Sequence, residues 1–474
     1  MNPSEPIPPL KPAHLLLQLL LAAASFPLQA QEAIVDTTRL TYTLFFPTPY
    51  YRVNYTYESV APDGTTPVTL SSALFFPQRI FERTKLVAIG SEDFNASGLV
   101  LNNHYTITTR DQAPTVTSSP QIEGPFVTLG PDVITISPDG YGFGITADKP
   151  QTYLMADATA RNNIDAVKAA RRLLKQMGYT CGNLFAQFGY SQGGHSTLAV
   201  QRYFDTHDPD PEAITHIDYT LCGAGPYDLS AMMDSLLIPG AMYSYPCALA
   251  LIAAGQIEGA SLDISFSDIF PQPLDTKVID WIDGKELTAD AINDSIFAIT
   301  GGDGKTGTLV SNILRTDNLS RTNPQMVPFF QAVDDNSLVS EWQPNDKTRF
   351  FIYHSRNDEI VPYYNMEHLR DFLRDDCGLD SDRLEVESTK GFHTEAATNF
   401  VLNVINKIAY LQTDYLAAAE DLPIIDLSND PSNASSHNHN SIPSGWFTLH
   451  GHRLPAAPTS PGLYLHNGRK VLIR

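Results

Sequence analysis

The residue types needed for nucleophilic acyl chemistry occur in this chain in a suggestive order. Ser191 lies in Gly189-Tyr190-Ser191-Gln192-Gly193, which has the pattern GxSxG. The apolar run 183–188 precedes it and a helical pattern over 192–204 follows it, so we expect a strand, a sharp turn and a helix in succession. A serine in such a turn is exposed beside a helix N-terminus at a sheet edge. Ser191 is therefore the candidate nucleophile.

A serine hydroxyl needs a base to take its proton and an acid to orient that base, in the chain order Ser, Asp, His for this kind of turn. Asp358 follows the strand-like run 349–354, and His393 follows the run 383–388 and opens the last long helical pattern. We predict His393 as the general base and Asp358 as its orienting acid. Glu359 and Asp376 are the alternatives to Asp358.

The negative oxygen of an acyl-transfer intermediate needs two hydrogen-bond donors. The backbone amide of Gln192, next to the nucleophile, is the first candidate. The second should come from the loop 90–95 after the strand-like run 85–90, where we favour Asp93 over Ser91 and Glu92. Another histidine, His195, would lie on the helix beyond the turn, so we expect it to pack in the interior.

The elements around these residues predict an α/β fold with a mostly parallel central sheet and helices on both faces. The runs 40–46, 51–60 and 67–76 indicate a leading antiparallel meander. Short apolar runs then follow at 85–90, 133–137, 183–189, 218–222 and 349–354, and helical patterns cover 157–177 and 394–419. Residues 228–345 change to short helical patterns, which we interpret as an insertion that caps the site.

These motifs together resemble the α/β-hydrolase superfamily and, within it, the secretory lipase family. Besides the serine turn, the resemblance rests on the segments 137–144 (SPDGYGFG), 153–166 and 223–228 (GAGPYD), and it spans about residues 42–416. The resemblance implies ester hydrolysis through a serine acyl-enzyme, with the insertion as a cap over the acyl pocket. It also implies an acidic oxyanion loop, which is why Asp93 is preferred, and it implies no cofactor or metal.

Two alternative functions remain at this stage. Serine peptidases of the prolyl oligopeptidase type share the GxSxGG turn, although the stretch from Gln31 to Ser191 leaves no room for their upstream propeller or β-domain. A non-catalytic surface binding protein on a hydrolase scaffold is the other alternative. The loss of a triad member would favour it, and all three residue types are present.

The two ends of the chain predict export. Lys11 precedes the apolar run 15–26, which is too short to span a bilayer, so we expect a signal peptide over 1–30 and a hydrolase domain over 31–427. Residues 428–445 are rich in Ser, Asn and Asp and predict a flexible linker. Residues 446–474, with the turn signal Asn467-Gly468, resemble type IX secretion sorting segments. That resemblance implies the type IX machinery as a partner and an extracellular, cell-surface or periplasmic location.

Charge and cysteine content narrow the partners further. The chain has 31 basic and 53 acidic residues, a net charge of −22 at pH 7, which disfavours binding to nucleic acid. Its four cysteines are too scattered for a disulfide scaffold or a zinc motif. His437, His439, His450 and His452 fit a solvated spacer better than a metal site. We therefore expect a small-molecule or lipid ester as substrate.

Overall fold

The structure is a computed structural model that describes residues 32–43, 46–89, 92–120, 122–207, 214, 216–420, 446–448, 453–454, 462–466 and 469–473. The chain divides into two compact units, Met1–Asp421 and Leu422–Arg474. The predicted signal peptide and linker and the four C-terminal histidines lie outside the described residues. Within those residues, no helix is long and apolar enough to cross a membrane.

A nine-stranded sheet forms the centre of the first unit, in the order β1-β2-β3-β7-β6-β8-β9-β12-β13. Its strands are β1 (Ala33–Thr43), β2 (Pro47–Val60), β3 (Pro67–Pro77), β6 (Ala96–Asn103), β7 (Val133–Pro138), β8 (Cys181–Tyr190), β9 (Tyr219–Gly223), β12 (Arg349–Ser355) and β13 (Leu384–Thr389). The pairs β1·β2, β2·β3 and β3·β7 are antiparallel, which confirms the leading meander. The strands from β7 to β13 pair in parallel, as the alternating pattern predicts.

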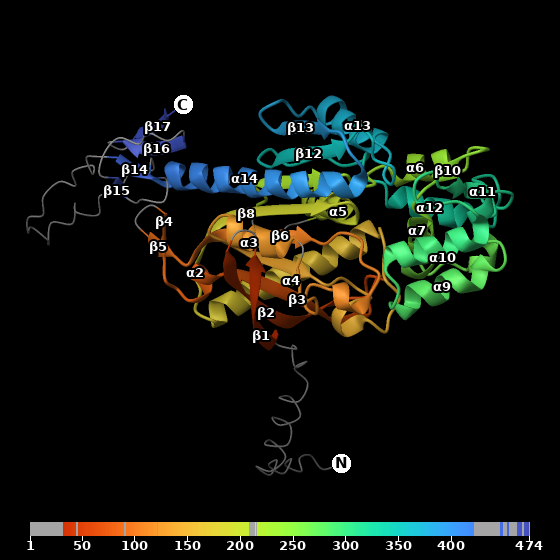
Figure 1. Ribbon diagram of the computed structural model, residues 1–474, viewed down its shortest axis with the longest axis horizontal. Coiled ribbons are helices and arrows are strands. Elements are labelled where there is room, and N and C mark those ends of the chain that lie inside the picture. The colour runs from red at the N-terminus through yellow and green to blue at the C-terminus, as the bar shows by residue number, and fades with distance from the viewer. Residues whose placement is uncertain are drawn as a thin grey trace, which may run out of the picture. The chain divides into compact units, whose positions relative to one another are not determined.

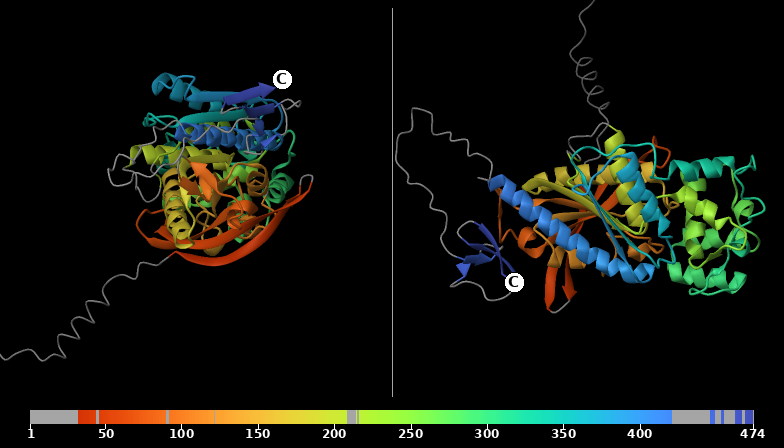
Figure 2. Two further views of the ribbon diagram at one scale, coloured as in Figure 1. Left: turned by 90° about the vertical axis from the view of Figure 1, so that its left-hand side faces the viewer. Right: turned by 90° about the horizontal axis from the view of Figure 1, so that it is seen from above.

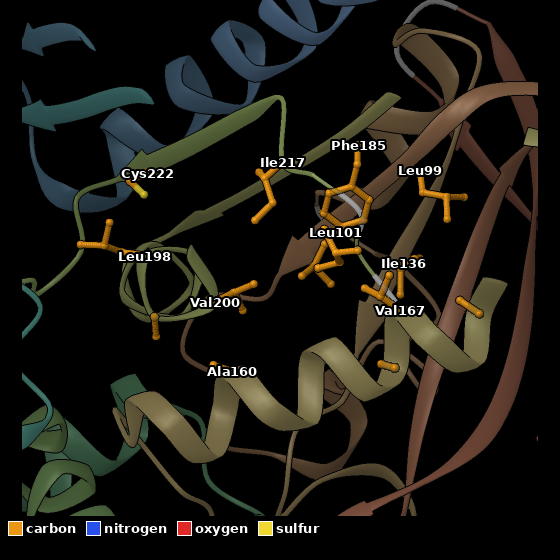
Figure 3. Packing of buried hydrophobic residues seen from close by; sticks show 14 of the residues in the cluster. Leu99, Leu101, Ile136, Ala160, Val167, Phe185, Leu198, Val200, Ile217 and Cys222 are labelled. Atoms are coloured by element: carbon orange, nitrogen blue, oxygen red, sulfur yellow. The ribbon is translucent and has the colours of Figure 1, made fainter. Parts of the chain in front are cut away.

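Helices cover both faces of this sheet because the buried strands are apolar on both sides. On one face lie α4 (Ala156–Gln176) and α5 (Gln192–Thr206), whose side chains meet Leu99, Leu101 and Phe185 (Figure 3). On the other face lie α3 (Glu123–Leu129) and α14 (His393–Glu420), which pack against the alternate residues Val100 and Ala186 (Figure 1). This two-sided packing confirms the predicted fold class.

Residues between β9 and β12 form a separate helical body with its own apolar core, which we call the cap. It comprises α6 (Leu229–Leu236), β10 (Met242–Tyr243), α7 (Pro246–Gly259), α8 (Phe266–Ile269), α9 (Leu274–Gly284), α10 (Ala289–Thr300), β11 (Thr308–Leu309), α11 (Val310–Ile313) and α12 (Val327–Asp335). The cap stands beyond the ends of the central strands, as Figures 1 and 2 show. Within the cap, β10 and β11 form a short antiparallel pair. The remaining short elements are α2 (Gln78–Phe81), η1 (Arg110–Gln112), η2 (Gly144–Thr146), α13 (Tyr364–Asp371) and η3 (Phe372–Asp376).

The strand predicted over 85–90 is wrong as a member of the central sheet. Residues there form β4 (Val87–Ile89), which pairs only with β5 (Glu92–Phe94) in a small two-stranded sheet. The central strand is β6, which follows β5 and was not predicted from the sequence. Gly98 obscures its pattern, but a Cβ at this position would lie 1.9 Å from the Leu184 carbonyl oxygen, so β6 needs glycine to approach β8.

The second unit is a four-stranded antiparallel sheet in the order β15-β14-β16-β17. Its strands are β14 (Trp446–Thr448), β15 (Arg453–Leu454), β16 (Gly462–His466) and β17 (Arg469–Ile473). β16 and β17 pair antiparallel, with His466 opposite Arg469, and the predicted turn at Asn467-Gly468 lies outside the described residues. All four cysteines of the chain, in the first unit, are free thiols.

Candidate active site

Ser191 occupies the turn between β8 and α5, as the GxSxG pattern predicts. Its φ of 60° and ψ of −123° lie in a sparsely populated region for a residue with a side chain. Such a conformation costs about 1–3 kcal/mol and persists only where its surroundings hold it. Here the Ser191 N–H donates to the Gly223 carbonyl at 2.8 Å, and the Ser191 carbonyl accepts the Gly194 N–H at 2.9 Å. The turn is thus fixed by the neighbouring strand β9 and by its own helix α5.

Two glycines allow this turn because the backbone comes too close for any side chain. A Cβ at Gly189 would lie 2.2 Å from the Gly193 carbonyl oxygen. A Cβ at Gly193 would lie 2.2 Å from the Asn103 carbonyl oxygen, at the end of β6. The glycines of the motif therefore let β8, α5 and β6 meet closely enough to expose Ser191 at the sheet edge.

His393 and Asp358 are brought together from loops that end neighbouring strands. Asp358 follows β12 and His393 is the first residue of α14, and the His393 Nδ1 lies 2.6 Å from Asp358 Oδ2. The Asp358 side chain is fully buried and that of His393 is only 6% exposed. Ser191 and His393 line the same cavity. Ser191 and His393 therefore face one cavity, and Asp358 contacts His393.

The state of Asp358 sets the direction of the His393 hydrogen bond. Burial raises the pKa of Asp358, but the charge of His393 and hydrogen bonds from His354 and His393 outweigh it, so the net pKa lies well below the usual range. The second oxygen, Oδ1, accepts the N–H groups of Ile360 and Val361 at 3.0 and 2.8 Å. An ionised Asp358 accepts only, so His393 Nδ1 carries the proton and Nε2 is left as the acceptor nitrogen.

The alternative acids occupy different places. Glu359 Oε2 accepts the backbone N–H of His393 at 2.9 Å, so it fixes the start of α14 and not the imidazole. Asp376 lies at the end of η3. Of the three carboxylates considered, only Asp358 contacts the His393 ring.

A second histidine that the sequence analysis did not select contacts the same carboxylate. His354 Nε2 lies 2.9 Å from the Val361 carbonyl oxygen and 3.3 Å from Asp358 Oδ2, both of them acceptors, so Nε2 must carry a proton. His354 is fully buried, and its Nδ1 has no hydrogen-bond partner among the described residues. A proton on Nδ1 would be buried without an acceptor, which favours a neutral ring. Its only sequence signal is its place four residues before Asp358.

His195 confirms its expected structural role. It is buried on α5, and its Nε2 lies 2.9 Å from the Asn336 carbonyl oxygen, just after α12 of the cap. Burial lowers the pKa of His195 to about 4, so the ring is neutral and donates to that carbonyl. His195 therefore joins the helix behind the nucleophile to the cap.

The prediction of Asp93 as an oxyanion donor is wrong. Asp93 lies on β5, just before β6 begins at Ala96. In the parallel pair of β6 and β8, Ala96 lies opposite Cys181 and Asn103 lies opposite Gly189. Asp93 is thus at the starting end of these strands, about 25 Å from the end that carries Ser191.

The loop after β6 takes the place expected for Asp93. Tyr105 and Thr106 follow Asn103 and line the same cavity as Ser191. Gln192 is the first residue of α5, so its amide is among the N–H groups without an acceptor inside the helix. A backbone amide of this loop, together with that of Gln192, is the donor pair that the topology supports. The missing signal was β6 itself, since this loop cannot be located before its strand.

A buried carboxyl, Asp139, stabilises the loop that follows β7. It accepts hydrogen bonds from Ser71 Oγ and from the backbone and hydroxyl of Thr115, and a Cβ on Gly144 would lie 2.0 Å from its Oδ2. Burial raises the pKa of Asp139 to about 6, and these hydrogen bonds oppose the rise only in part. The backbone carbonyl of Asp139 also lies 3.1 Å from His104 Nε2 in the loop after β6. The motif at 137–144 therefore stabilises the loop after β6, which is the candidate source of the second oxyanion donor.

The cavity beside Ser191 has a volume of about 910 Å³ and a mostly apolar and aromatic lining. It is lined by Tyr42, Tyr105, Thr106, Ser119, Pro120, Ile122, Pro125, Leu129, Tyr153, Leu154, Tyr190, Ser191, Pro226, Met232, Tyr243, Tyr245, Ala248, Ile252, Ile360, Val361, His393, Thr394, Ala397, Thr398, Val401 and Leu402. No Asp, Glu, Lys or Arg is among these described residues. Such a lining suits a neutral, apolar ligand with its polar group at Ser191.

The cap is joined to the loop that carries the acid. Tyr243 donates its hydroxyl to the Ile360 carbonyl at 3.2 Å, and Ser244 donates to the Glu359 carbonyl at 2.9 Å. These acceptors lie two residues and one residue after Asp358. A movement of the cap would therefore shift the loop that carries Asp358.

In the part of the chain that the structure describes, no group of three or more His, Cys, Asp or Glu residues is arranged to hold a metal ion.

Comparison with known proteins identifies the fold. No protein-family model and no curated protein matches the sequence. Among solved structures, the rice cell wall degrading esterase LipA from Xanthomonas oryzae is similar, with a TM-score of 0.61, 21% identity, and coverage of 83% of this chain and 100% of LipA. Candida antarctica lipase A in its closed state has a TM-score of 0.54 and 13% identity over 82% of this chain and 83% of the lipase. Together with the sheet order and the serine turn, these similarities show that the chain has an α/β-hydrolase fold.

Proposed function

We propose that the protein is a serine carboxylic ester hydrolase, an esterase or lipase. The observation that carries this proposal is the His393–Asp358 pair at 2.6 Å, with His393 sharing a cavity with a strained serine at the nucleophile turn. The likeness to an esterase and a lipase agrees with it but by itself concerns only the fold.

The proposed reaction proceeds through an acyl-enzyme. Ser191 Oγ attacks the ester carbonyl while His393 Nε2 takes the hydroxyl proton, and Asp358 stabilises the imidazolium that forms. The amides of Gln192 and of the loop after β6 donate to the negative oxygen. The intermediate then collapses: the bond from carbon to the alcohol oxygen breaks, and His393 returns its proton to that oxygen. A water molecule then gives a proton to His393 and attacks the acyl-serine carbonyl. The second intermediate collapses, His393 returns the proton to Ser191 Oγ, and the acid is released.

The cavity favours esters over the alternative peptide substrates. A peptide carries polar amides that an apolar lining would leave without partners, whereas an ester with apolar groups loses little on leaving water. Two other functions are tested beside ester hydrolysis. They are peptide cleavage of the prolyl oligopeptidase type and ligand binding without turnover.

The test is a ladder of p-nitrophenyl esters from acetate to palmitate, hydrolysed by the wild type and by Ser191→Ala in parallel. The proposal expects turnover by the wild type and loss of at least about 10⁴-fold in the variant. Absence of turnover on all esters, with cleavage of proline-containing peptides instead, would replace the ester hydrolase by the peptidase. A wild type that is inert on both sets would favour a binding protein.

We also propose that the protein is exported, with residues 1–30 as a signal peptide and 446–474 as a type IX sorting segment. The antiparallel strands β14 to β17 support a folded terminal module. Expression in a host with that machinery, with and without residues 446–474, tests it. Equal amounts of both chains outside the cell would contradict the sorting role.

A further inference from the structure

The cavity extends from Ser191 along two different walls. The first wall, which we call the cap arm, belongs to the loop before α4 and to the cap, and consists of Tyr153, Leu154, Met232, Tyr243, Tyr245, Ala248 and Ile252. The second wall, which we call the α3–α14 groove, belongs to β1, α3 with its preceding residue Ile122, and α14, and consists of Tyr42, Ile122, Pro125, Leu129, Thr394, Ala397, Thr398, Val401 and Leu402. The cavity at Ser191 is thus lined by mostly apolar side chains from two different parts of the fold.

The groove follows one face of α14. Thr394, Ala397, Thr398 and Val401 have the spacing i, i+3, i+4 and i+7, which places them on one side of the helix. Of the residues between them, Ala396 and Phe400 pack into the core against the sheet. From Thr394 to Leu402 the helix rises about 12 Å, which sets the length of the groove. Its small side chains, one Ala and two Thr, leave the space that makes it a groove.

The two arms differ in how they end. In the cap arm, Met232, Ala248 and Ile252 are all buried, at 2%, 5% and 2% exposure, so that wall is closely packed. In the groove, Leu129 and Leu402 are 45% and 49% exposed, so its far end is open to solvent. Closely packed side chains limit the length of what enters the cap arm, whereas an open groove sets no such limit.

The proton transfer decides which part of the ester lies in which arm. His393 must give its proton to the leaving alcohol oxygen, so that oxygen lies within hydrogen-bond reach of His393. His393 is the first residue of α14, and the groove begins at the next residue, Thr394. A chain attached to the leaving oxygen therefore enters the groove along α14, and the acyl chain is directed to the cap arm.

We propose that the α3–α14 groove binds the apolar alcohol portion of the substrate, which makes the substrate class an ester of a long apolar alcohol with a fatty acid. The proposal rests on the proposed ester hydrolase and deepens it. It also accounts for the absence of acidic and basic residues among the described residues of the groove, since neither part of such an ester carries charge.

The test varies the two halves of the ester separately in the full-length chain. One series holds the acid at butyrate and lengthens the alcohol from ethyl to octyl, and the other holds the alcohol at ethyl and lengthens the acid. The groove variant is Thr398→Trp, at an exposed position of the helix that lines the groove, and its matched control is Asn406→Trp, exposed on the same helix and outside the lining. Ala397→Leu is a milder second groove variant.

For the wild type and Asn406→Trp we expect kcat/KM to rise at least about tenfold from the ethyl to the octyl alcohol, since each buried methylene favours binding. Thr398→Trp should lose that rise while kcat/KM still changes with acyl length in the ethyl ester series as it does in the wild type. A flat alcohol series in an active wild type, or equal alcohol series in Thr398→Trp and Asn406→Trp, would overturn the groove and leave the ester hydrolase standing. A wild type inert on every ester would overturn both.

Discussion

Replacing Asp358 by Asn reverses one hydrogen bond at the base without changing the size of the side chain. In the wild type, Oδ1 accepts the N–H groups of Ile360 and Val361, and Oδ2 faces His393 Nδ1 at 2.6 Å. The Asn oxygen must remain with the two backbone donors, because they have no other acceptor there. The amide NH₂ then faces Nδ1, so the imidazole must place its proton on Nε2, where it can no longer accept one from Ser191.

The expected loss is about 10⁴-fold in kcat, the size found when the wrong tautomer is imposed on a serine triad. At about 1.36 kcal/mol per tenfold, this corresponds to about 5.4 kcal/mol of lost transition-state stabilisation. The matched control is Glu359→Gln. Its amide oxygen can still accept the His393 backbone N–H that Glu359 accepts at 2.9 Å, so kcat should stay within about threefold of the wild type.

The assay is steady-state hydrolysis of p-nitrophenyl butyrate by both variants, with thermal unfolding to verify that each is folded. A folded Asp358→Asn variant that keeps kcat within tenfold of the wild type would refute the assignment of the acid. So would a larger loss in Glu359→Gln than in Asp358→Asn, since it would transfer the role to the neighbouring carboxylate.

Three further changes test the surroundings of the site. His354→Leu removes the second imidazole at the acid, so steady-state kinetics should show kcat lower by about 10- to 100-fold, and an unchanged kcat would contradict a positioning role. Gly193→Ala would place a Cβ 2.2 Å from the Asn103 carbonyl oxygen, so urea unfolding should show about 1–3 kcal/mol lost, whereas Gly284→Ala, with nothing within 4 Å, should lose little; equal stabilities would argue against the close approach. Burial raises the pKa of Asp139 to about 6, so between about pH 4 and 6 the folded chain holds a proton that the unfolded chain has lost, and stability falls as pH rises, by up to about 3 kcal/mol. Asp139→Asn should lack this fall in urea titrations at pH 4.5 and 7, and parallel pH dependences of the two proteins would count against it.

Local pattern was enough to predict the elements that bear the nucleophile and the base. The strand β8 is mostly apolar, and α5 and α14 have helical periodicity, so Ser191 and His393 could be placed at element ends. Asp358 could be ranked above its neighbours because it follows a buried strand. Each of these inferences needs only residues adjacent in sequence.

What could not be predicted depends on contacts between distant segments. β6 contains a glycine that only its packing against β8 explains, and missing this strand led to the wrong choice of Asp93. Nothing in the local sequence distinguishes His354 from other residues at strand ends. Its contact with Asp358 exists only because the loop after β12 brings Asp358 close to it. The α3–α14 groove joins residues more than 250 positions apart, such as Leu129 and Thr394, and has no local pattern at all.

The most direct test of the central claim is covalent labelling with a fluorophosphonate, which reacts with activated serines, followed by peptide mass spectrometry. If Ser191 is the nucleophile, we expect one adduct per chain on the peptide that contains Ser191, no adduct in Ser191→Ala, and loss of ester hydrolysis in step with labelling. Full labelling at another serine, or hydrolysis that survives complete labelling of Ser191, would contradict the account.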